Sequence, residues 1–401
     1  MVRKQELPAL LVGMTATLAG IGVARFAYTP LLPELVKQGW FEDTQAVYLG
    51  AANLLGYLIG ALSAHRLSER LPLRRLMGLC FAAIALSFIL CAQPSSFEWF
   101  FCWRLIAGIT GAILMVVGPA TALAATPPTR RAGVGALVFT GIGLGALLSA
   151  SLVPLLMQFS LSATWLALGS LALAAGLIGD RSLIRLEAAK PASLNQPTAV
   201  TTTETNPLGW VLLCVMAAYA LDAVGFVPHT VFWVDYLARE RALGTEAASL
   251  QWAAFGLGAV CGPLIAGWVV QRCGWHKGLV LAFSVKAVAV LLPLLSIALV
   301  SRTLSSFIVG ALVPGIVALT SGRIAELVGS ADHKRYWGLA TAVFAIAQAL
   351  SGYSMSALYD AWGSYFYLFY AGSAALAGGA VLITLSRLFQ HQTTTTTDSY
   401  R

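Results

Sequence analysis

Five charged side chains lie deep within long apolar stretches of the sequence, where they are the residues best placed to bind or move a charged species. One is acidic, Asp222, and four are basic: Arg25, Arg104, Lys286 and Arg323. A charge is costly inside a lipid bilayer, so a side chain that keeps one there is a functional candidate by default.

Asp222 is the acidic candidate for solute or proton handling. Asp222, Phe226, His229 and Trp233 follow at i, i+4, i+7 and i+11, which places them on one face of a helix. A structural salt bridge, or a hydrogen bond to a neighbouring helix, explains a buried carboxylate almost as well. His229 is a weaker candidate for a proton relay, because a buried histidine is usually a satisfied polar residue. Asp235, near the end of the stretch, is expected at a solvated rim.

The arginines call for different chemistry, because a guanidinium stays charged and cannot carry a proton. Arg25 and Arg104 can instead grip a carboxylate or phosphate, and Arg25 can pair with Asp222. Lys286 is expected to extend its amine along the helix toward the membrane surface.

Several other polar residues complete the set of candidates. Arg323 and Glu326, three residues apart, form a predicted gate or end-cap pair. Weaker candidates for substrate contact or proton coupling are Tyr28, Asn53, Tyr57 and Gln348, although hydrogen bonding between helices explains them equally well.

The elements that must position these residues follow from composition. Of 401 residues, 58% are hydrophobic and 10% are charged, against roughly 25% charged in soluble domains. The chain is therefore not a soluble enzyme, a secreted disulfide scaffold or a nucleic-acid binder. Its long apolar runs, without period-two alternation, predict an all-α integral membrane protein. The twelve predicted spans are 9–36, 46–65, 73–93, 98–125, 132–157, 162–180, 208–236, 247–271, 277–300, 304–327, 336–359 and 364–388.

The loops between these spans predict the orientation. With the N-terminus in the cytoplasm, 17 of the 25 Lys and Arg residues fall on the cytoplasmic side, 4 on the opposite side and 4 inside spans. This asymmetry favours an even number of spans with both ends in the cytoplasm.

The chain also divides at its midpoint. We expect an N-terminal six-helix bundle over 1–180, a flexible cytoplasmic linker over 181–207, a C-terminal six-helix bundle over 208–389 and a disordered tail over 390–401. An offset of 206 aligns residues 56–60 with 262–266 and Arg66 with Arg272. These matches predict two six-helix pseudo-repeats in parallel orientation, although chance similarity between glycine-rich helices is the alternative.

One loop resembles the G-x-x-x-D-R/K-x-G-R/K-R/K motif of the major facilitator superfamily. It retains Gly267, Arg272, Gly274 and Lys277, while Gln271 replaces the acidic residue. The resemblance implies a cytoplasmic gating loop, but the missing carboxylate removes the acid–arginine clasp expected there.

Further motifs narrow the resemblance and cover essentially the whole chain. Arg104 with Gly108 matches a fourth-helix pattern of the superfamily, and residues 22–33 are similar to the first-helix signature of the bacterial YbfB/YjiJ group. The resemblance implies the major facilitator fold, in which the first, fourth, seventh and tenth helices surround a cavity. Arg25, Arg104 and Asp222 would then share one aqueous space.

These features predict a secondary active transporter in the bacterial cytoplasmic (inner) membrane, working by alternating access as a monomer with no cofactor. No Walker A sequence occurs, which disfavours ATP drive. The surplus of arginine over acid in the presumed cavity favours an anionic or zwitterionic small-molecule substrate, and Asp222 suggests protons as coupling ions. The alternatives are a drug or metabolite efflux pump of the same fold and, from another class, a membrane-embedded sensor or enzyme.

Overall fold

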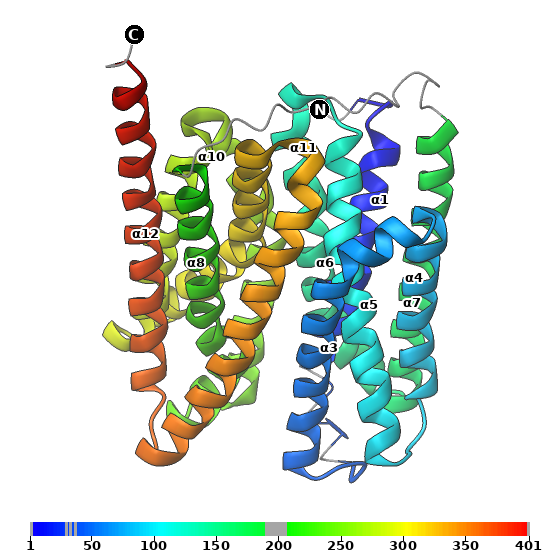
Figure 1. Ribbon diagram of the computed structural model, residues 1–401. Coiled ribbons are helices and arrows are strands. Elements are labelled where there is room, and N and C mark those ends of the chain that lie inside the picture. Colours follow the sequence, from blue (N-terminus) through cyan, green and yellow to red (C-terminus); the bar gives the residue numbers. More distant parts are fainter. Residues whose placement is uncertain (1–2, 29–30, 32–33, 36–37, 189–206, 399–401) are drawn as a thin grey trace.

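The structure is a computed structural model that describes residues 3–28, 31, 34–35, 38–188 and 207–398. These residues are almost entirely helical, and no strand occurs among them. A helix satisfies its backbone hydrogen bonds within one segment, which is what a lipid environment demands. The expected all-helical architecture is confirmed (Figure 1).

The described residues of the N-terminal half form helices. They are α1 (Leu7–Thr17), the π-helix η1 (Leu18–Phe26) that continues it, α3 (Asp43–Arg70), α4 (Leu73–Leu90), α5 (Phe97–Ala124), the short 3-10 helix η2 (Pro128–Arg130), α6 (Arg131–Met157) and α7 (Leu161–Ala188). Local chemistry sets several of their starts. Glu42 and Gln45 form a capping box at α3, and the Ser96 side chain accepts a bond from the Trp99 backbone N–H at 3.3 Å at α5.

The described helices of the C-terminal half differ widely in length. They are α8 (Pro207–Val227), the π-helix η3 (Pro228–Phe232), α9 (Trp233–Asp235), the π-helix η4 (Tyr236–Glu240), the long α10 (Gly244–Leu295) and α11 (Leu299–Trp362), and α12 (Phe366–Asp398). Both α10 and α11 are bent at a glycine with positive φ: Gly274 (φ 80°) and Gly329 (φ 74°). Other residues rarely adopt this conformation, so each of these glycines joins two helical segments in series.

Ten segments of the described residues are long and apolar enough to cross a membrane. Leu250–Leu295, 46 residues long, counts as one of the ten although it contains the bend at Gly274, and α3 is not among them.

Some sequence-based boundaries differ from the structure. Part of the predicted first span, 9–36, and residues 189–206 of the predicted linker lie outside the described residues. α7 extends to Ala188, eight residues into that linker. α12 continues to Asp398, through most of the tail that its composition predicts to be disordered. Extending an existing helix needs no new nucleus, which lets threonines of modest helix propensity continue it.

The helices of each half cross at glycines. In the N-terminal half, a Cβ at Gly60 of α3 would collide with the carbonyl oxygen of Ile109 in α5. In the C-terminal half, a Cβ at Gly262 of α10 would collide with the carbonyl oxygen of Ala311 in α11. Only glycine permits backbones to approach this closely.

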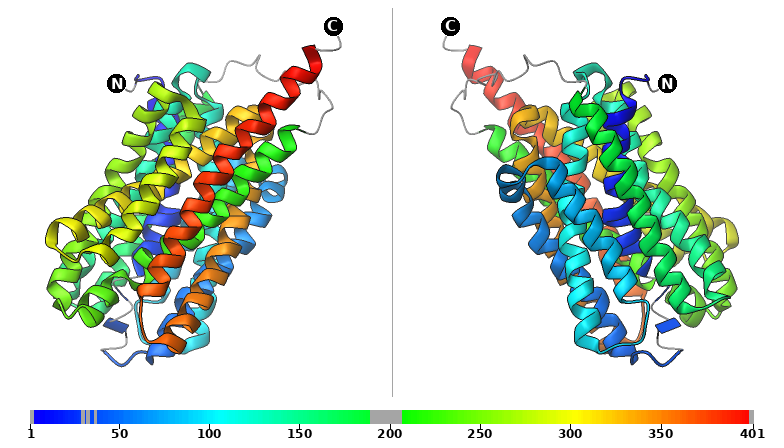
Figure 2. Two further views of the ribbon diagram at one scale, coloured as in Figure 1. Left: turned by 90° about the vertical axis from the view of Figure 1, so that its left-hand side faces the viewer. Right: turned by 90° about the vertical axis from the view of Figure 1, so that its right-hand side faces the viewer.

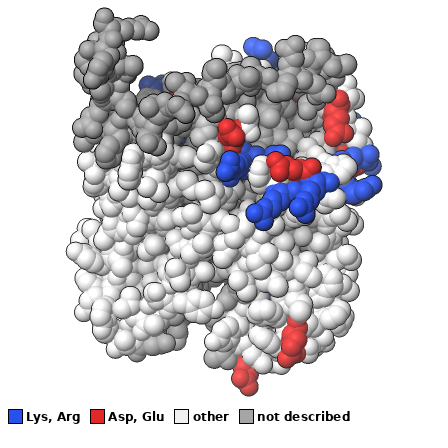
Figure 3. Space-filling view, viewed as in Figure 1, with Lys and Arg blue, Asp and Glu red and all other residues white. Residues whose placement is uncertain are grey.

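The helices run side by side, with α8 and α12 toward one side of the molecule and α4, α5 and α7 toward the other (Figure 1). The start of α1 and the end of α12 lie at the same end of the bundle, which we call the terminal end (Figure 2). On the face shown in Figure 3, Lys and Arg gather in a belt near this end, above a broad uncharged surface. The α3–α4 turn contributes the exposed residues Arg66, Arg70, Arg74 and Arg75.

Candidate functional site

Arg25 lies in the π-helix η1, where the N-terminal half faces the C-terminal half. Its guanidinium carbon lies 5.8 Å from the ring centroid of Tyr57 in α3 and 5.9 Å from that of Phe226 in α8. The side chain is half-buried, and no carboxylate among the described residues forms an ion pair with it. π-Helical turns are frequent at functional sites, and this one places a charged fork against aromatic rings from both halves.

Arg104 of α5 has a different environment. It is buried, its Nη1 donates to the carbonyl oxygen of Ala24 at 2.9 Å, and its guanidinium carbon lies 4.2 Å from the ring centroid of Tyr28. The buried Asn53 amide donates to the Arg104 carbonyl oxygen at 3.2 Å. Arg104, Tyr28 and Asn53 therefore link η1, α3 and α5 to one another.

Asp222 of α8 pairs with Lys286 of the second α10 segment, not with Arg25. The Lys286 amine donates to Asp222 Oδ1 at 2.7 Å, and their side chains are 0% and 2% exposed, respectively. The expectation that Lys286 extends to the membrane surface is wrong. Its side chain points into the C-terminal half, where a buried carboxylate compensates its charge.

Both Lys286 and Arg25 lie near the ring of Phe226. Its ring centroid lies 5.7 Å from the Lys286 amine and 5.9 Å from the Arg25 guanidinium carbon. Because Asp222 neutralises Lys286, the cation that faces this ring without a carboxylate partner among the described residues is Arg25.

His229 is fully buried within the C-terminal half. Its Nε2 lies 2.8 Å from the Ser305 hydroxyl, which in turn donates to the Ala289 carbonyl oxygen at 2.7 Å. The hydroxyl proton is thus committed, so Nε2 is the donor and Nδ1 has no hydrogen-bond partner among the described residues. The imidazole also stacks on Trp233, with centroids 4.6 Å apart. These contacts connect η3 with α10 and α11.

An aromatic stack extends from the Arg25 site. Phe226 and Phe344 lie 5.6 Å apart, Tyr219 and Phe344 4.6 Å, and Tyr219 and Trp337 5.7 Å. Phe139 of α6 follows at 6.3 Å from Trp337. The sequence does not predict this stack, because aromatic residues in apolar helices give no signal of which neighbouring helix they face.

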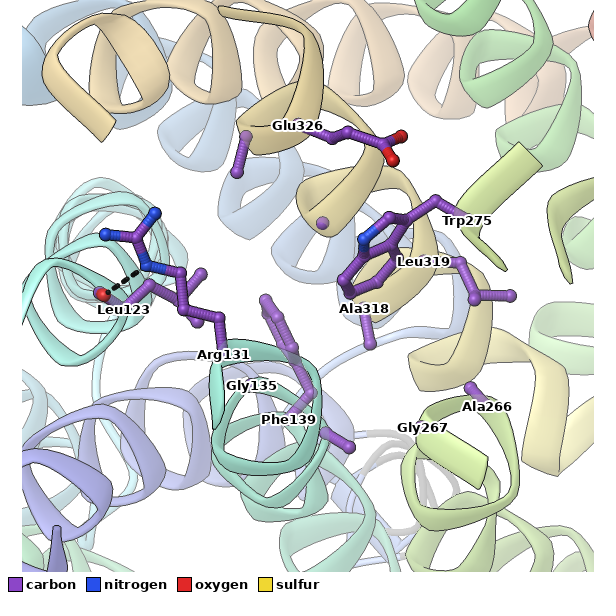
Figure 4. Close-up of a pocket in the computed structure, with 13 residues that line it drawn as sticks. Leu123, Arg131, Gly135, Phe139, Ala266, Gly267, Trp275, Ala318, Leu319 and Glu326 are labelled. Carbon is purple, nitrogen blue, oxygen red and sulfur yellow. Dashed lines mark hydrogen bonds between the residues drawn. The ribbon is translucent and has the colours of Figure 1, made fainter. Parts of the chain in front are cut away.

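A cavity of about 270 Å³ lies between the two halves at the far end of this stack. Phe139 and Arg131 of α6 line one side, and Trp275 of α10 and Glu326 of α11 line the other (Figure 4). Arg131 Nε donates to the carbonyl oxygens of Leu123 at 3.2 Å and Thr126 at 3.1 Å.

The motif loop of α10 lies beside this cavity. Gly267 lines it, and Gly274 forms the bend. The Gln271 amide lies beside Gly133 of α6, on the opposite half. The exposed Arg272 stacks on Trp268 at 4.2 Å, and Lys277 is also exposed.

Two further candidates from the sequence have definite positions. Arg323 and Glu326 form an ion pair within α11, as their spacing predicts, and Glu326 also lines the cavity. Gln348 is buried in the second α11 segment, and its Oε1 has no hydrogen-bond partner among the described residues. The structure thus brings Arg25 and Tyr57 together at one site and places Arg104, His229 and Gln348 in separate surroundings.

Comparison with known proteins bears on this arrangement. The sequence profile of a family described as "Uncharacterised MFS-type transporter YbfB" matches residues 17–384. The chain is 27% identical over 268 residues to the "Uncharacterized MFS-type transporter YceJ" of Bacillus subtilis (strain 168), covering 65% of this chain and 66% of that protein. The match thus spans slightly less than two thirds of that relative's length.

A likeness of fold extends further than the likeness of sequence. The crystal structure of the major facilitator superfamily transporter FucP in the outward conformation superposes with a TM-score of 0.68. The sequence identity is 17%, and the superposition covers 95% of this chain and 98% of FucP.

Proposed function

Because this chain belongs to the YbfB-type family of major facilitator superfamily transporters, we propose that it is a secondary active transporter of a small organic anion or zwitterion. In this proposal it works by alternating access, as a monomer without a cofactor, in a bacterial inner membrane. The family and the fold make it a multi-pass membrane transporter.

Two features support a count of twelve spans. Dividing Leu250–Leu295 at Gly274 turns the ten membrane-length segments into eleven, and α3 supplies a twelfth. α3 has 28 residues, which corresponds to about 42 Å of helix and exceeds a hydrocarbon core of about 30 Å.

Helix crossings support two six-helix repeats. Glycines lie at the crossing of α3 with α5 and at the crossing of α10 with α11. Each glycine contact at the first crossing has a counterpart at the second, at a constant distance along the chain. The equivalent contacts are Gly56–Leu105 with Gly258–Phe307, Gly60–Ile109 with Gly262–Ala311, and Gly108–Asn53 with Gly310–Phe255. All are related by an offset of 202 residues, which these contacts favour over the sequence-based offset of 206. Repeats in parallel orientation are suited to rocking about a central site.

Charge and cavity support the orientation. The belt of basic residues at the terminal end (Figure 3) matches the positive-inside rule, so we place both termini in the cytoplasm. The cavity is lined by the ends of α5 and of the first α11 segment and by the start of α6, all at the terminal end. This placement fits a form in which the space between the halves is reached from the cytoplasm.

The observation that carries the proposed substrate charge is the environment of Arg25. Its guanidinium faces aromatic rings of both halves, while the neighbouring Lys286 is neutralised by Asp222. A cation between the two halves attracts an anion or the carboxylate of a zwitterion.

Flux measurements test this proposal. The purified protein in proteoliposomes should exchange a radiolabelled organic acid from a panel of metabolites. Arg25→Gln should reduce that flux at least about tenfold, since charged hydrogen bonds contribute roughly 1.5–3 kcal/mol. Arg75→Gln, which removes an exposed arginine at the start of α4, is the control and should keep normal flux. Flux of the acid that is equal in Arg25→Gln and the unmodified protein would reject Arg25 as the anion site.

We assign proton coupling to Asp222. Among the residues whose side chains the structure describes, it is the carboxylate buried within the membrane-spanning part of the bundle. A proton on Asp222 would release Lys286, whose amine lies 5.7 Å from the centroid of the Phe226 ring that Arg25 also faces. Asp222→Asn should abolish flux driven by a pH gradient while preserving exchange without a gradient. Unchanged gradient-driven flux would exclude this residue as the coupling group.

A further inference from the structure

The aromatic surroundings of Arg25 point beyond an organic anion in general. We propose that the substrate is an aryl monocarboxylate, whose carboxylate binds the Arg25 guanidinium. Its ring packs against an aromatic wall next to Arg25, which is formed by the stacked side chains of Phe226, Phe344 and Tyr219. The inference rests on the proposed function and specifies the substrate class of the same site.

The guanidinium has donors available for a carboxylate. The guanidinium lies near the rings of Tyr57 and Phe226 and donates no hydrogen bond to an oxygen of the described residues. Its five N–H groups can therefore donate to a ligand. The planar fork of an arginine matches a carboxylate through two parallel hydrogen bonds. Arg104, by contrast, donates to the Ala24 carbonyl oxygen, so part of its fork is already occupied.

The local charge fits a monoanion. Lys286 is balanced by Asp222 at 2.7 Å, so the pair adds no net charge to the surroundings of Phe226. Arg25 is then the charge that faces the aromatic rings, and one carboxylate neutralises it.

The wall beside Arg25 is aromatic. Tyr219 and Phe344 are inclined by 31° with centroids 4.6 Å apart, and Phe226 and Phe344 are inclined by 28° at 5.6 Å. These three rings come from α8 and from the second α11 segment, whereas Tyr57 comes from α3 of the other half. Because these rings stack face to face, the side of the stack presents their edges, and an edge-to-face contact favours another π-system over a saturated chain of equal size.

Binding to the purified full-length protein tests this proposal. Isothermal titration in detergent would compare benzoate, phenylacetate and indole-3-acetate with cyclohexanecarboxylate and hexanoate, with benzamide as the uncharged control. We expect at least one aryl acid to bind about five- to tenfold more tightly than both aliphatic acids, which is the size of a favourable ring–ring contact. Benzamide should bind weakly, and its binding should not depend on Arg25.

Two variants separate the carboxylate from the ring. Arg25→Lys keeps the charge and should weaken aryl-acid binding about tenfold through loss of the bidentate fork. Phe344→Leu should reduce the preference for aryl over aliphatic acids to near one while acid binding stays dependent on Arg25. Unfolding temperatures measured in parallel would show that both variants remain folded.

The outcomes distinguish the two proposals. Aliphatic acids that bind as tightly as aryl acids, with the same dependence on Arg25, would overturn the aryl assignment and retain an organic-anion transporter. Acid binding that is unaffected by Arg25→Gln would overturn both. A preference for aryl acids that persists in Phe344→Leu and in Tyr219→Leu would place the ring outside the proposed wall and overturn the assignment.

Discussion

The two halves of the molecule share their helix crossings but differ in their buried charges. Glycine contacts between α3 and α5 correspond to those between α10 and α11 at a constant offset of 202 residues. The N-terminal half holds Arg25 and Arg104 without an ion-pair partner among the described residues, whereas the C-terminal half holds the Lys286–Asp222 pair. Close backbone contacts are thus alike in the two halves, whereas the pairing of the buried charges differs.

The difference extends to the depth of the ion pairs. In the N-terminal half, Glu6 pairs with Arg130 and Arg74 with Asp180, all near helix ends at the terminal end. The C-terminal half also has a partly exposed pair, Arg323 with Glu326, but its Lys286 and Asp222 pair out of contact with solvent. The C-terminal half should therefore depend on its buried pair much more than the N-terminal half depends on its own.

The largest effect is expected from Lys286→Met. This variant leaves the Asp222 carboxylate buried without its partner, which should destabilise the protein by about 3–5 kcal/mol. The measurement is thermal unfolding in detergent, together with the monodisperse fraction by size-exclusion chromatography.

The double variant Asp222→Asn with Lys286→Met supplies the control. It removes both charges and should recover most of the lost stability, because an apolar replacement of a buried pair is often neutral. A double variant as unstable as Lys286→Met alone would mean that packing of the lysine stem, and not its charge, explains the loss.

The next largest loss of stability is expected at the glycine crossings, which occur in both halves. Gly60→Ala and Gly262→Ala each place a methyl group against a carbonyl oxygen of the crossing helix, so each should cost about 1–3 kcal/mol. Similar losses in the two halves would support the repeat. Gly78→Ala in α4 and Gly352→Ala in α11, where a Cβ meets nothing within 4 Å, should not destabilise. A loss of stability confined to one of the two variants would contradict equivalent helix crossings in the two halves.

The sequence predicts which residues carry buried charge but, apart from Arg323 with Glu326, not their partners. Arg25 and Asp222 are visible because charged residues stand out in apolar stretches. The Lys286–Asp222 pair is not visible, because it depends on the rotation of α10 against α8, and an isolated helix contains no information about that rotation. Segments such as η1 and η3 add to the difficulty, since a π-helix shifts the faces that a 3.6-residue period predicts.

The fold was more accessible to sequence analysis than the site. Apolar runs identified the helices because length and hydropathy are local properties. The glycine contacts favour an offset of 202 residues over the expected 206, a difference of about one helical turn, because glycines four apart align equally well in either register. The aromatic wall beside Arg25 combines residues from α3, α8 and α11, and only tertiary packing brings them together.

A smaller effect compares equivalent positions of α5 and α11. Arg104 and Ser306 are 202 residues apart, and both are buried links to neighbouring helices. Ser306 accepts from Trp233 Nε1 at 3.0 Å and donates to Gln251 at 3.2 Å. Ser306→Ala and Arg104→Lys should each cost about 1–2 kcal/mol in unfolding measurements, since each removes buried hydrogen bonds.

Measurements of organic-acid binding test whether Arg104 differs in role from Arg25. If Arg104 is a structural link, Arg104→Lys should bind organic acids nearly as tightly as the unmodified protein does, in contrast to Arg25→Lys. An equal loss of acid binding in the two variants would instead place Arg104 in the anion site.

The smallest effect concerns the ion pair at the terminal end of the N-terminal half. Arg130 donates two hydrogen bonds to the Glu6 carboxylate, at 2.9 and 3.0 Å, and these hold the pKa of Glu6 at about 2, below its ordinary value of 4.5. Stability from this pair is complete above pH 4.5 and is lost as the pH falls toward 2. The unfolding temperature in detergent should therefore decline over this range, and Glu6→Gln should reduce the decline. Glu187→Gln removes an exposed carboxylate and serves as the control. Acid sensitivity that is identical in Glu6→Gln and the control would show that the N-terminal half does not rely on this pair.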